Sequence, residues 1–166
     1  MNYSGVADPS NTLVRVVPAE AKDLAAAAAQ LLVDFNREYN DPAPDPAWLA
    51  DHLSTLIAGG DTSVLLVGDP AVAVAVLRFR TSTWSANSEA YLAEFYVIPP
   101  LRGRGIGSEF LMAILDHARE RGARYMDLTT TEEDRAARRV YEKHGFDCHE
   151  GKGRGPVSLY YELDLD

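Results

Sequence analysis

The feature that most constrains the fold is residues 91–121, where a buried strand, a basic glycine loop and an amphipathic helix follow one another. Apolar and aromatic residues dominate 91–98 and favour a strand. Pro99 and Pro100 should end that strand, because neither can donate a hydrogen bond to a neighbouring strand. Beyond them, apolar residues recur at helical spacing, which predicts a helix with one apolar face. These residues are Ile106, Phe110, Leu111, Ile114, Leu115 and Ala118.

The loop between this strand and helix is rich in glycine and arginine. Its residues are Arg102, Gly103, Arg104, Gly105, Ile106, Gly107 and Ser108. A glycine loop that opens a helix leaves backbone N–H groups unpaired at the positive end of the helix dipole, and the arginines add positive charge. An ordinary turn is the alternative, but a turn does not require so many glycines and arginines. The loop therefore predicts a phosphate-binding site.

Two better-known phosphate loops do not fit the spacing. A dinucleotide fold places Gly-x-Gly-x-x-Gly directly after the strand, with an acidic residue about twenty positions later. Here the spacing is Gly103-x-Gly105-x-Gly107, and residues 99–102 intervene. Asp127 lies in the right region, but it sits inside an apolar strand pattern. A P-loop is excluded because no Gly-Lys-Ser/Thr follows the glycines.

Periodicity and turn signals predict the remaining elements. Strands are expected at 13–17, 62–68, 71–81, 125–130, 146–150 and 157–165, and helices from about 18 to 39, from 47 to 58 and from 132 to 145. This mixture of strands and helices along the chain favours an α/β fold with a sheet covered by helices. Residues 1–11 are expected to form a flexible arm, and 12–166 a single domain.

Composition narrows the class of protein. The chain has 166 residues, 46% of them apolar and 25% charged, as in an ordinary soluble domain. Its net charge is −9, with five basic and twelve acidic side chains in residues 1–101, which argues against nucleic-acid binding. The apolar run 71–77 is too short to cross a bilayer, and the N-terminus lacks a signal-like pattern. The lone Cys148 fits a reducing compartment, so a cytoplasmic location without membrane contact is expected.

Two motifs resemble those of the GCN5-related N-acetyltransferase (GNAT) superfamily. Arg102-x-x-Gly105-x-Gly107 is similar to its pyrophosphate loop, and Asp134-x-x-Ala137-x-x-x-Tyr141-x-x-x-Gly145-Phe146 looks like its second signature. The order of elements resembles that family over nearly all of 12–165. The resemblance implies a mixed sheet of about seven strands with helices on both faces. It also implies that the central strand splays from the next one, with acetyl-coenzyme A wedged between them.

The resemblance further implies transfer of an acetyl group from acetyl-coenzyme A to a primary amine. Glu94, or a water chain ending at a base, would take the proton of the amine. Tyr141 would protonate the departing thiolate, since a phenol is a neutral donor at pH 7. Each residue also has a structural alternative: Glu94 as a strand carboxylate facing solvent or an arginine, and Tyr141 as packing on an apolar helix face.

The main chain of the central strand would orient the thioester, and the side chains there could merely be core. The expected coenzyme-binding residues are Phe95, Tyr96, Val97, Arg102, Gly103, Arg104, Gly105, Ile106, Gly107, Ser108, Asp134 and Tyr141. Asp134 stands where the family often has asparagine, and an ionised aspartate can only accept hydrogen bonds. Ala93 stands where polyamine-type relatives often have an acid. The histidines lack metal-ligand spacing, so no metal is expected.

The acceptor is expected to be a small-molecule amine. Acidic residues in the first half of the chain, among them Glu38, Asp41 and Asp45, would suit a cationic substrate. A protein N-terminus or lysine is the alternative acceptor. A regulatory module that binds acetyl-coenzyme A without turnover is a rival of another class, and a nicotinamide-dependent oxidoreductase is a third. Dimerisation through C-terminal strands is common in similar proteins, so a homodimer is the expected assembly.

Overall fold

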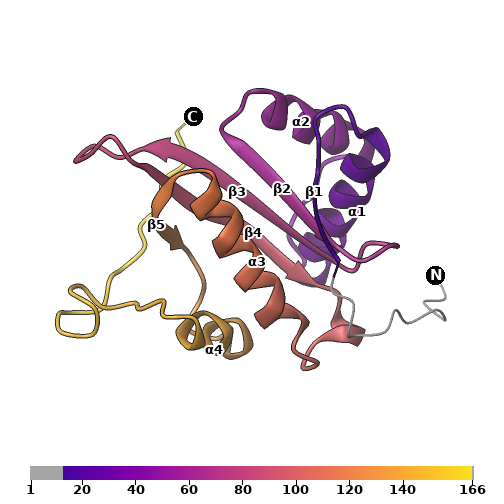
Figure 1. Ribbon diagram of the computed structural model, residues 1–166. Coiled ribbons are helices and arrows are strands. Elements are labelled where there is room, and N and C mark those ends of the chain that lie inside the picture. The colour runs from indigo at the N-terminus through magenta and orange to yellow at the C-terminus, as the bar shows by residue number, and fades with distance from the viewer. Residues whose placement is uncertain (1–12, 166) are drawn as a thin grey trace. The chain divides into compact units, whose positions relative to one another are not determined.

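The computed structural model describes residues 13–165, and its internal contacts divide the chain into two compact units that meet between Leu128 and Thr129 (Figure 1). The predicted flexible arm at 1–11 lies outside the described residues. The expectation of a single domain over 12–166 stays a prediction.

The first unit is built on one mixed sheet. Its strands are β1 (Val14–Val16), β2 (Thr62–Val67), β3 (Ala73–Thr81), β4 (Ser88–Val97) and β5 (Ala123–Leu128), and they lie side by side in chain order. The first four are antiparallel to their neighbours, whereas β5 runs parallel to β4. A crossover through a helix is what allows that parallel pair. The mixed α/β class is thus confirmed, with five strands in the described residues rather than about seven.

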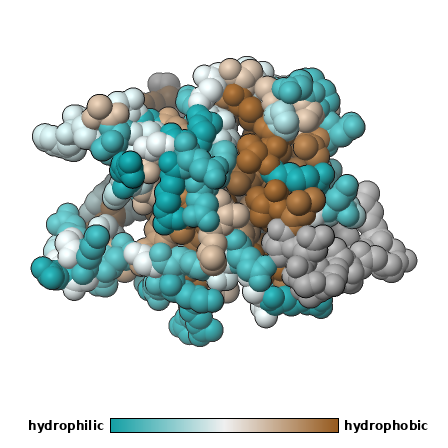
Figure 2. Space-filling model, in the orientation of Figure 1, coloured by the Kyte–Doolittle hydropathy of each residue, from teal (hydrophilic) through white to brown (hydrophobic). Residues whose placement is uncertain are grey.

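Helices cover both faces of this sheet. Helices α1 (Lys22–Glu38) and α2 (Pro46–Ala58) pack on one face, and α3 (Ile106–Glu120) lies on the other (Figure 1). On the first face, apolar side chains of α1 and α2 form a core with Val64, Val74 and Tyr96. On the second, the ring of Phe110 in α3 is fully buried and lies 5.8 Å from the ring of Phe95. Figure 2 shows apolar side chains gathered over β1 and β2, beside the hydrophilic surface of α3.

Element boundaries differ from the predicted ones for local reasons. Helix α1 begins at Lys22, because the N–H of Ala21 bonds to the carbonyl of Pro18 and forms a turn first. Helix α2 begins at Pro46, where the carboxylate of Asp45 caps the amides of Ala47 and Trp48. Strand β4 begins at Ser88, inside the predicted loop, because Ser88 pairs with Thr81 of β3 and closes a hairpin.

The two central strands separate at one end, as the sequence predicted. Strand β5 pairs with β4 only from Ser88 to Leu92, so β4 from Ala93 to Val97 has no strand partner on that side among the described residues. On its other side, β4 stays paired with β3 along its whole length, except at a bulge where Ala93 is the extra residue. The second half of β4 therefore has one open edge.

The second unit contains one helix, α4 (Arg135–Lys143), capped by Asp134 and ended by Gly145 in the left-handed region (φ 90°). The two predicted final strands at 146–150 and 157–165 are absent as strands. A single bridge joins His149 and Val157, and the loop between them bends through left-handed residues. The apolar alternation suits a strand, but a strand forms only where a neighbour satisfies its backbone groups.

Candidate active site

The glycine loop adopts a backbone that only glycine accepts easily. Gly103 (φ 73°) and Gly105 (φ 90°) are both left-handed, and a Cβ added to either would meet no atom within 4 Å. Packing therefore does not require these glycines, whereas the backbone conformation does. Gly105 is the N-cap of α3, and no side chain caps this helix.

Five consecutive amides of this loop face no acceptor. The N–H groups from 103 to 107 donate no hydrogen bond within residues 13–165, whereas the N–H of Arg102 just before them bonds to the carbonyl of Pro99. Such groups at a helix N-terminus bond to water or to a ligand, and the helix dipole adds a favourable field for negative charge. The side chain of Arg104 is exposed and without an ion pair among the described residues. This arrangement can bind a phosphate or pyrophosphate group.

The other arginine of the loop points elsewhere. The Nε of Arg102 donates to the carbonyl of Val97 at 2.8 Å. Its two terminal nitrogens bind both carboxylate oxygens of Glu38 at 2.6 and 2.8 Å, and its guanidinium lies 5.4 Å from the ring centre of Tyr96. The hydrogen bond from Arg102 lowers the pKa of Glu38, and Glu38 in turn raises the pKa of Arg102. Burial, with the negative charge of Glu38, raises the pKa of Tyr96 to about 12.

The open end of β4 presents backbone groups beside the loop. The N–H of Ile98 bonds to the carbonyl of Val72, so by alternation both backbone groups of Val97 point away from β3, toward the open edge. A Cβ added to Gly107, in the first turn of α3, would lie 3.9 Å from Val97 and 3.8 Å from Phe95. The phosphate-type loop and the open strand edge are therefore neighbours within one unit.

Glu94 lies on the opposite face of β4 from Phe95. Phe95 packs against α3, so alternation turns Glu94 toward the face that carries α1 and α2, as it does Tyr96, whose ring stacks on Phe35. The carboxyl group of Glu94 is half-buried and has no hydrogen bond or ion pair within the described residues. Burial raises its pKa. A carboxylate that is desolvated and unpaired is suited to accepting a proton.

In the second unit, Tyr141 is buried and its ring meets that of Phe146 edge-on at 5.9 Å. Burial raises its pKa, and the carboxylate of Asp134 adds to the rise. The phenol is therefore neutral at pH 7. The side chain of Asp134 accepts from the N–H of Ala137 at 3.1 Å, so it is used as a helix cap. A contact from Asp134 to pantetheine stays a prediction.

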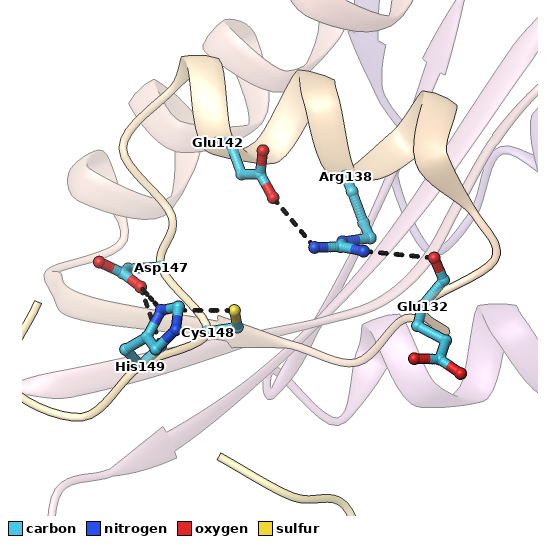
Figure 3. A network of polar contacts seen from close by, with 6 residues as sticks. All are labelled: Glu132, Arg138, Glu142, Asp147, Cys148 and His149. Atoms are coloured by element: carbon cyan, nitrogen blue, oxygen red, sulfur yellow. Dashed lines mark hydrogen bonds and ion pairs between the residues drawn. The ribbon is translucent and has the colours of Figure 1, made fainter. Parts of the chain in front are cut away.

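Polar contacts elsewhere in this unit hold the helix and the turn after it (Figure 3). Arg138 donates to the carbonyl of Glu132 at 3.2 Å and approaches Glu142 at 3.5 Å. After α4, the carboxylate of Asp147 accepts from the backbone and ring nitrogens of His149 at 2.8 and 2.9 Å.

Cys148 completes the one group of potential metal ligands in the described residues, with ligand atoms within 4.8 Å of one another. All three residues of this group, Asp147, Cys148 and His149, are exposed and consecutive, and a side chain bonded to the backbone two positions on accounts for their closeness. The expectation that no metal is bound stays a prediction.

The acidic residues expected to attract a cationic acceptor have separate roles. Glu38 is paired with Arg102, and Asp45 caps α2. Asp41 has no ion pair or hydrogen bond to its carboxylate in the described part of the chain, and it lines an open hollow of about 420 Å³ with Arg37 and Asn40. The pairing of Glu38 with Arg102 was not predicted. The two residues are 64 positions apart, and no local pattern marks such a pair.

A mixed α/β sheet with a splayed strand and a glycine loop at the next helix is the arrangement that the two motifs predicted for a coenzyme-dependent acyltransferase. Residues 25–146 match the Acetyltransferase (GNAT) family. The chain belongs to this family, and the enzyme class predicted from the two motifs is confirmed.

Relatives and solved structures agree with this assignment. The chain is 25% identical over 130 residues to the uncharacterized N-acetyltransferase YhfO of Bacillus subtilis (strain 168), an alignment that covers 77% of this chain and 87% of that protein. It is 38% identical over 61 residues to the aminoalkylphosphonate N-acetyltransferase of Salmonella typhimurium, covering 37% and 40% of the two chains.

Among solved structures, a candidate acetyltransferase from Arthrobacter sp. FB24 superposes with a TM-score of 0.82 at 38% identity, covering 99% of this chain and all of that one. An aminoglycoside acetyltransferase from a soil metagenome shares the fold, with a TM-score of 0.74 at 16% identity over 93% and 98% of the chains. None of the helices between residues 13 and 165 combines the length and apolar character of a membrane span.

Proposed function

We propose that the protein transfers an acetyl group from acetyl-coenzyme A directly to the primary amine of a small molecule. The observation that carries this proposal is the row of five unpaired amides at 103–107, adjacent to the open edge of β4. The amides and the α3 dipole would hold the pyrophosphate, and Arg104 would add a cation that solvent does not shield completely.

The open edge of β4 would hold the rest of the coenzyme. An extended pantetheine arm can bond to the backbone groups that β5 leaves unpaired between Ala93 and Val97. The N–H of Val97 would then donate to the thioester oxygen, where negative charge develops as the amine adds. By the same alternation, the backbone groups of Phe95 would contribute beside those of Val97, whereas the backbone groups of Tyr96 face Val74 of β3. The predicted contact from Tyr96 to the coenzyme would then need its side chain, which packs on the face opposite to that of Phe95.

The proton transfers would fall to two side chains. An alkyl amine is protonated near neutral pH and must lose a proton before it attacks. Glu94, directly or through a water, would accept this proton, and its unpaired, half-buried state suits the task. The C–N bond forms, the C–S bond breaks, and the coenzyme A thiolate takes a proton from the neutral phenol of Tyr141.

The relatives support a small-molecule acceptor. The similar Salmonella enzyme is named for an aminoalkylphosphonate, which is a small primary amine. A non-catalytic binding module is less well supported, because such a module has no use for an unpaired carboxylate that burial destabilises. The predicted cytoplasmic location and homodimer accompany this proposal, and cell fractionation and light scattering would check them.

The first experiment measures binding and turnover on the same preparation. Calorimetric titration with coenzyme A tests the loop, with the oxidised nicotinamide dinucleotide as a negative control. Release of free thiol from acetyl-coenzyme A is then followed with polyamines, aminoglycosides, aminoalkylphosphonates, amino acids and short peptides. Tight coenzyme binding with turnover of a small amine is the expected result. Turnover of peptides alone would replace the proposed acceptor class, and absence of coenzyme binding would refute the proposal.

A further inference from the structure

The side chain of Arg102 is bound to the strand rather than to the phosphate loop. It extends from the loop toward the end of β4 and donates to the carbonyl of Val97. Both carboxylate oxygens of Glu38 hold it there. Bidentate pairs of this kind are the strong and geometrically specific form of the arginine–carboxylate contact. The two residues come from elements far apart in sequence, the C-terminal end of α1 and the turn after β4.

The Nε of Arg102 donates to a backbone carbonyl, that of Val97, at the open edge of β4. Val97 ends β4 on its open edge, where no strand among the described residues supplies a donor to its carbonyl. In an extended strand, the N–H and the carbonyl of one residue point to the same side. A guanidinium that holds the Val97 carbonyl therefore also sets the direction of the Val97 N–H.

We infer that Glu38 is a positioning residue for acetyl transfer. Through Arg102 it fixes the backbone of Val97, whose N–H orients the thioester. This inference rests on the proposed function. It assigns the two loop arginines different tasks, since Arg104 would contact phosphate and Arg102 would hold the strand. It also assigns Glu38 to the coenzyme side of the reaction rather than to recognition of a cationic acceptor.

Neighbouring groups support the arrangement. The ring of Tyr96 lies under the guanidinium, and burial together with the negative charge of Glu38 raises the pKa of the Tyr96 hydroxyl. Tyr96 is itself stacked on Phe35 of α1 with ring centres 5.1 Å apart. Without the Glu38 charge, Arg102 would be free to turn toward the anion in the loop, and the Val97 carbonyl would lose its donor. Glu38 thus competes with the coenzyme phosphates for Arg102.

The test compares Glu38→Gln and Arg102→Lys with the wild type. The first removes one charge, and the second keeps the charge but loses the planar set of donors. Both should lower kcat by about tenfold or more, because small misplacements of reacting groups are costly. The dissociation constant of coenzyme A should stay within about twofold for Glu38→Gln or become tighter. The double variant should be no slower than the worse single variant, since both act through one contact.

Arg80 supplies a matched control. It bridges Glu89 of β4 and Asp127 of β5 at 3.0 and 3.1 Å, with the same chemistry at the paired end of the strand. Arg80→Lys should leave kcat unchanged. A charge-reversed pair, Glu38→Arg with Arg102→Glu, should regain melting temperature but not kcat, because a glutamate cannot donate to the Val97 carbonyl.

The outcomes separate this inference from the proposed function. If the wild type neither binds coenzyme A nor releases thiol, the proposed function fails. If the wild type is active, three results would overturn the inference alone: an unchanged kcat in Glu38→Gln with only a lower melting temperature, a loss confined to coenzyme affinity, or full recovery of kcat in the charge-reversed pair. A loss of kcat with coenzyme binding retained supports it.

Discussion

The two halves of β4 differ although they belong to one strand. From Ser88 to Leu92 the strand is paired on both sides, and its carboxylate, Glu89, is bonded to Arg80. From Ala93 to Val97 one edge is open, and the carboxylate there, Glu94, is unpaired within the described residues. Hydrogen bonds from Ser82 and Arg80 lower the pKa of Glu89, while burial raises that of Glu94. The first half supports structure, and the second is available for chemistry.

The largest effect is expected where the open half meets the glycine loop. Gly105→Asp places a carboxylate against the proposed pyrophosphate and should weaken coenzyme A binding by about a hundredfold or more, measured by calorimetric titration. Gly105→Asn adds a similar side chain, which also tolerates the left-handed region, without the charge, and it should cost much less. The gap between these two variants isolates electrostatics from backbone strain.

Gly122 provides the positional control for that experiment. It has the same left-handed conformation (φ 83°) and the same empty space around its Cβ position, but it follows the other end of α3. Gly122→Asp should lower stability without changing coenzyme affinity. Equal losses of affinity in Gly122→Asp and Gly105→Asp would refute the loop as the phosphate site.

The next largest effect concerns the proton donor. Tyr141→Phe removes one hydroxyl and should lower kcat by about a hundredfold, the usual contribution of a positioned acid, with coenzyme affinity nearly unchanged. Steady-state kinetics and titration together measure the two quantities. Tyr160 is an exposed tyrosine of the same unit, and Tyr160→Phe should be neutral. An undiminished rate in Tyr141→Phe would reduce Tyr141 to a packing residue.

The two glutamates of β4 allow a direct test of the comparison. Glu94→Gln should lower kcat by at least about tenfold. It should also abolish the fall in rate at low pH that protonation of Glu94 causes in the wild type. Glu89→Gln, five positions earlier on the same strand, should leave the profile unaltered because its carboxylate is paired with Arg80. Unchanged profiles in both variants would show that the halves of β4 do not differ in function.

The smallest effect is on stability. The folded-state pKa of Glu94 lies above its unfolded value. Between these two pKa values, the folded protein binds more protons than the unfolded chain. Stability should therefore be lost as the pH rises through the folded pKa of Glu94. Glu94→Gln should lack this loss and melt a few degrees higher than the wild type at pH 8, but not at pH 4. Thermal melts across pH 4–8 measure it, and identical curves would contradict the pKa assignment.

Much of the fold could be predicted because its signals are local. The apolar runs of β2 to β5, the amphipathic pattern of α3 and the glycine loop all depend on residues close in sequence. Helix α4 was also predicted within a few positions, although Asp134, expected to contact the coenzyme, proved to be its capping residue. The two final strands predicted at 146–150 and 157–165 were wrong, because alternation describes one strand and pairing needs a second.

The features of the candidate site also divide into those set by neighbouring residues and those set by residues distant in sequence. The glycine loop and Tyr141 were predicted from the two motifs, and Glu94 from its place in the central strand; their roles in binding and proton transfer stay predictions. The partner of Arg102 could not be predicted from the sequence, and the loop was expected to use both arginines in the same way. Only the fold brings Glu38 of α1 to Arg102, and only the pleat of β4 decides that Val97 turns its backbone groups to the open edge.

By itself, the sequence determined an acetyltransferase of the GNAT family and the position of its glycine loop, because short-range patterns suffice for both. The tertiary structure alone decided that Glu89 is paired and Glu94 is not, and that one arginine holds the strand while the other is free of ion pairs among the described residues. Solvation and pairing are properties of the space around a side chain, and that space is filled by residues distant in the sequence.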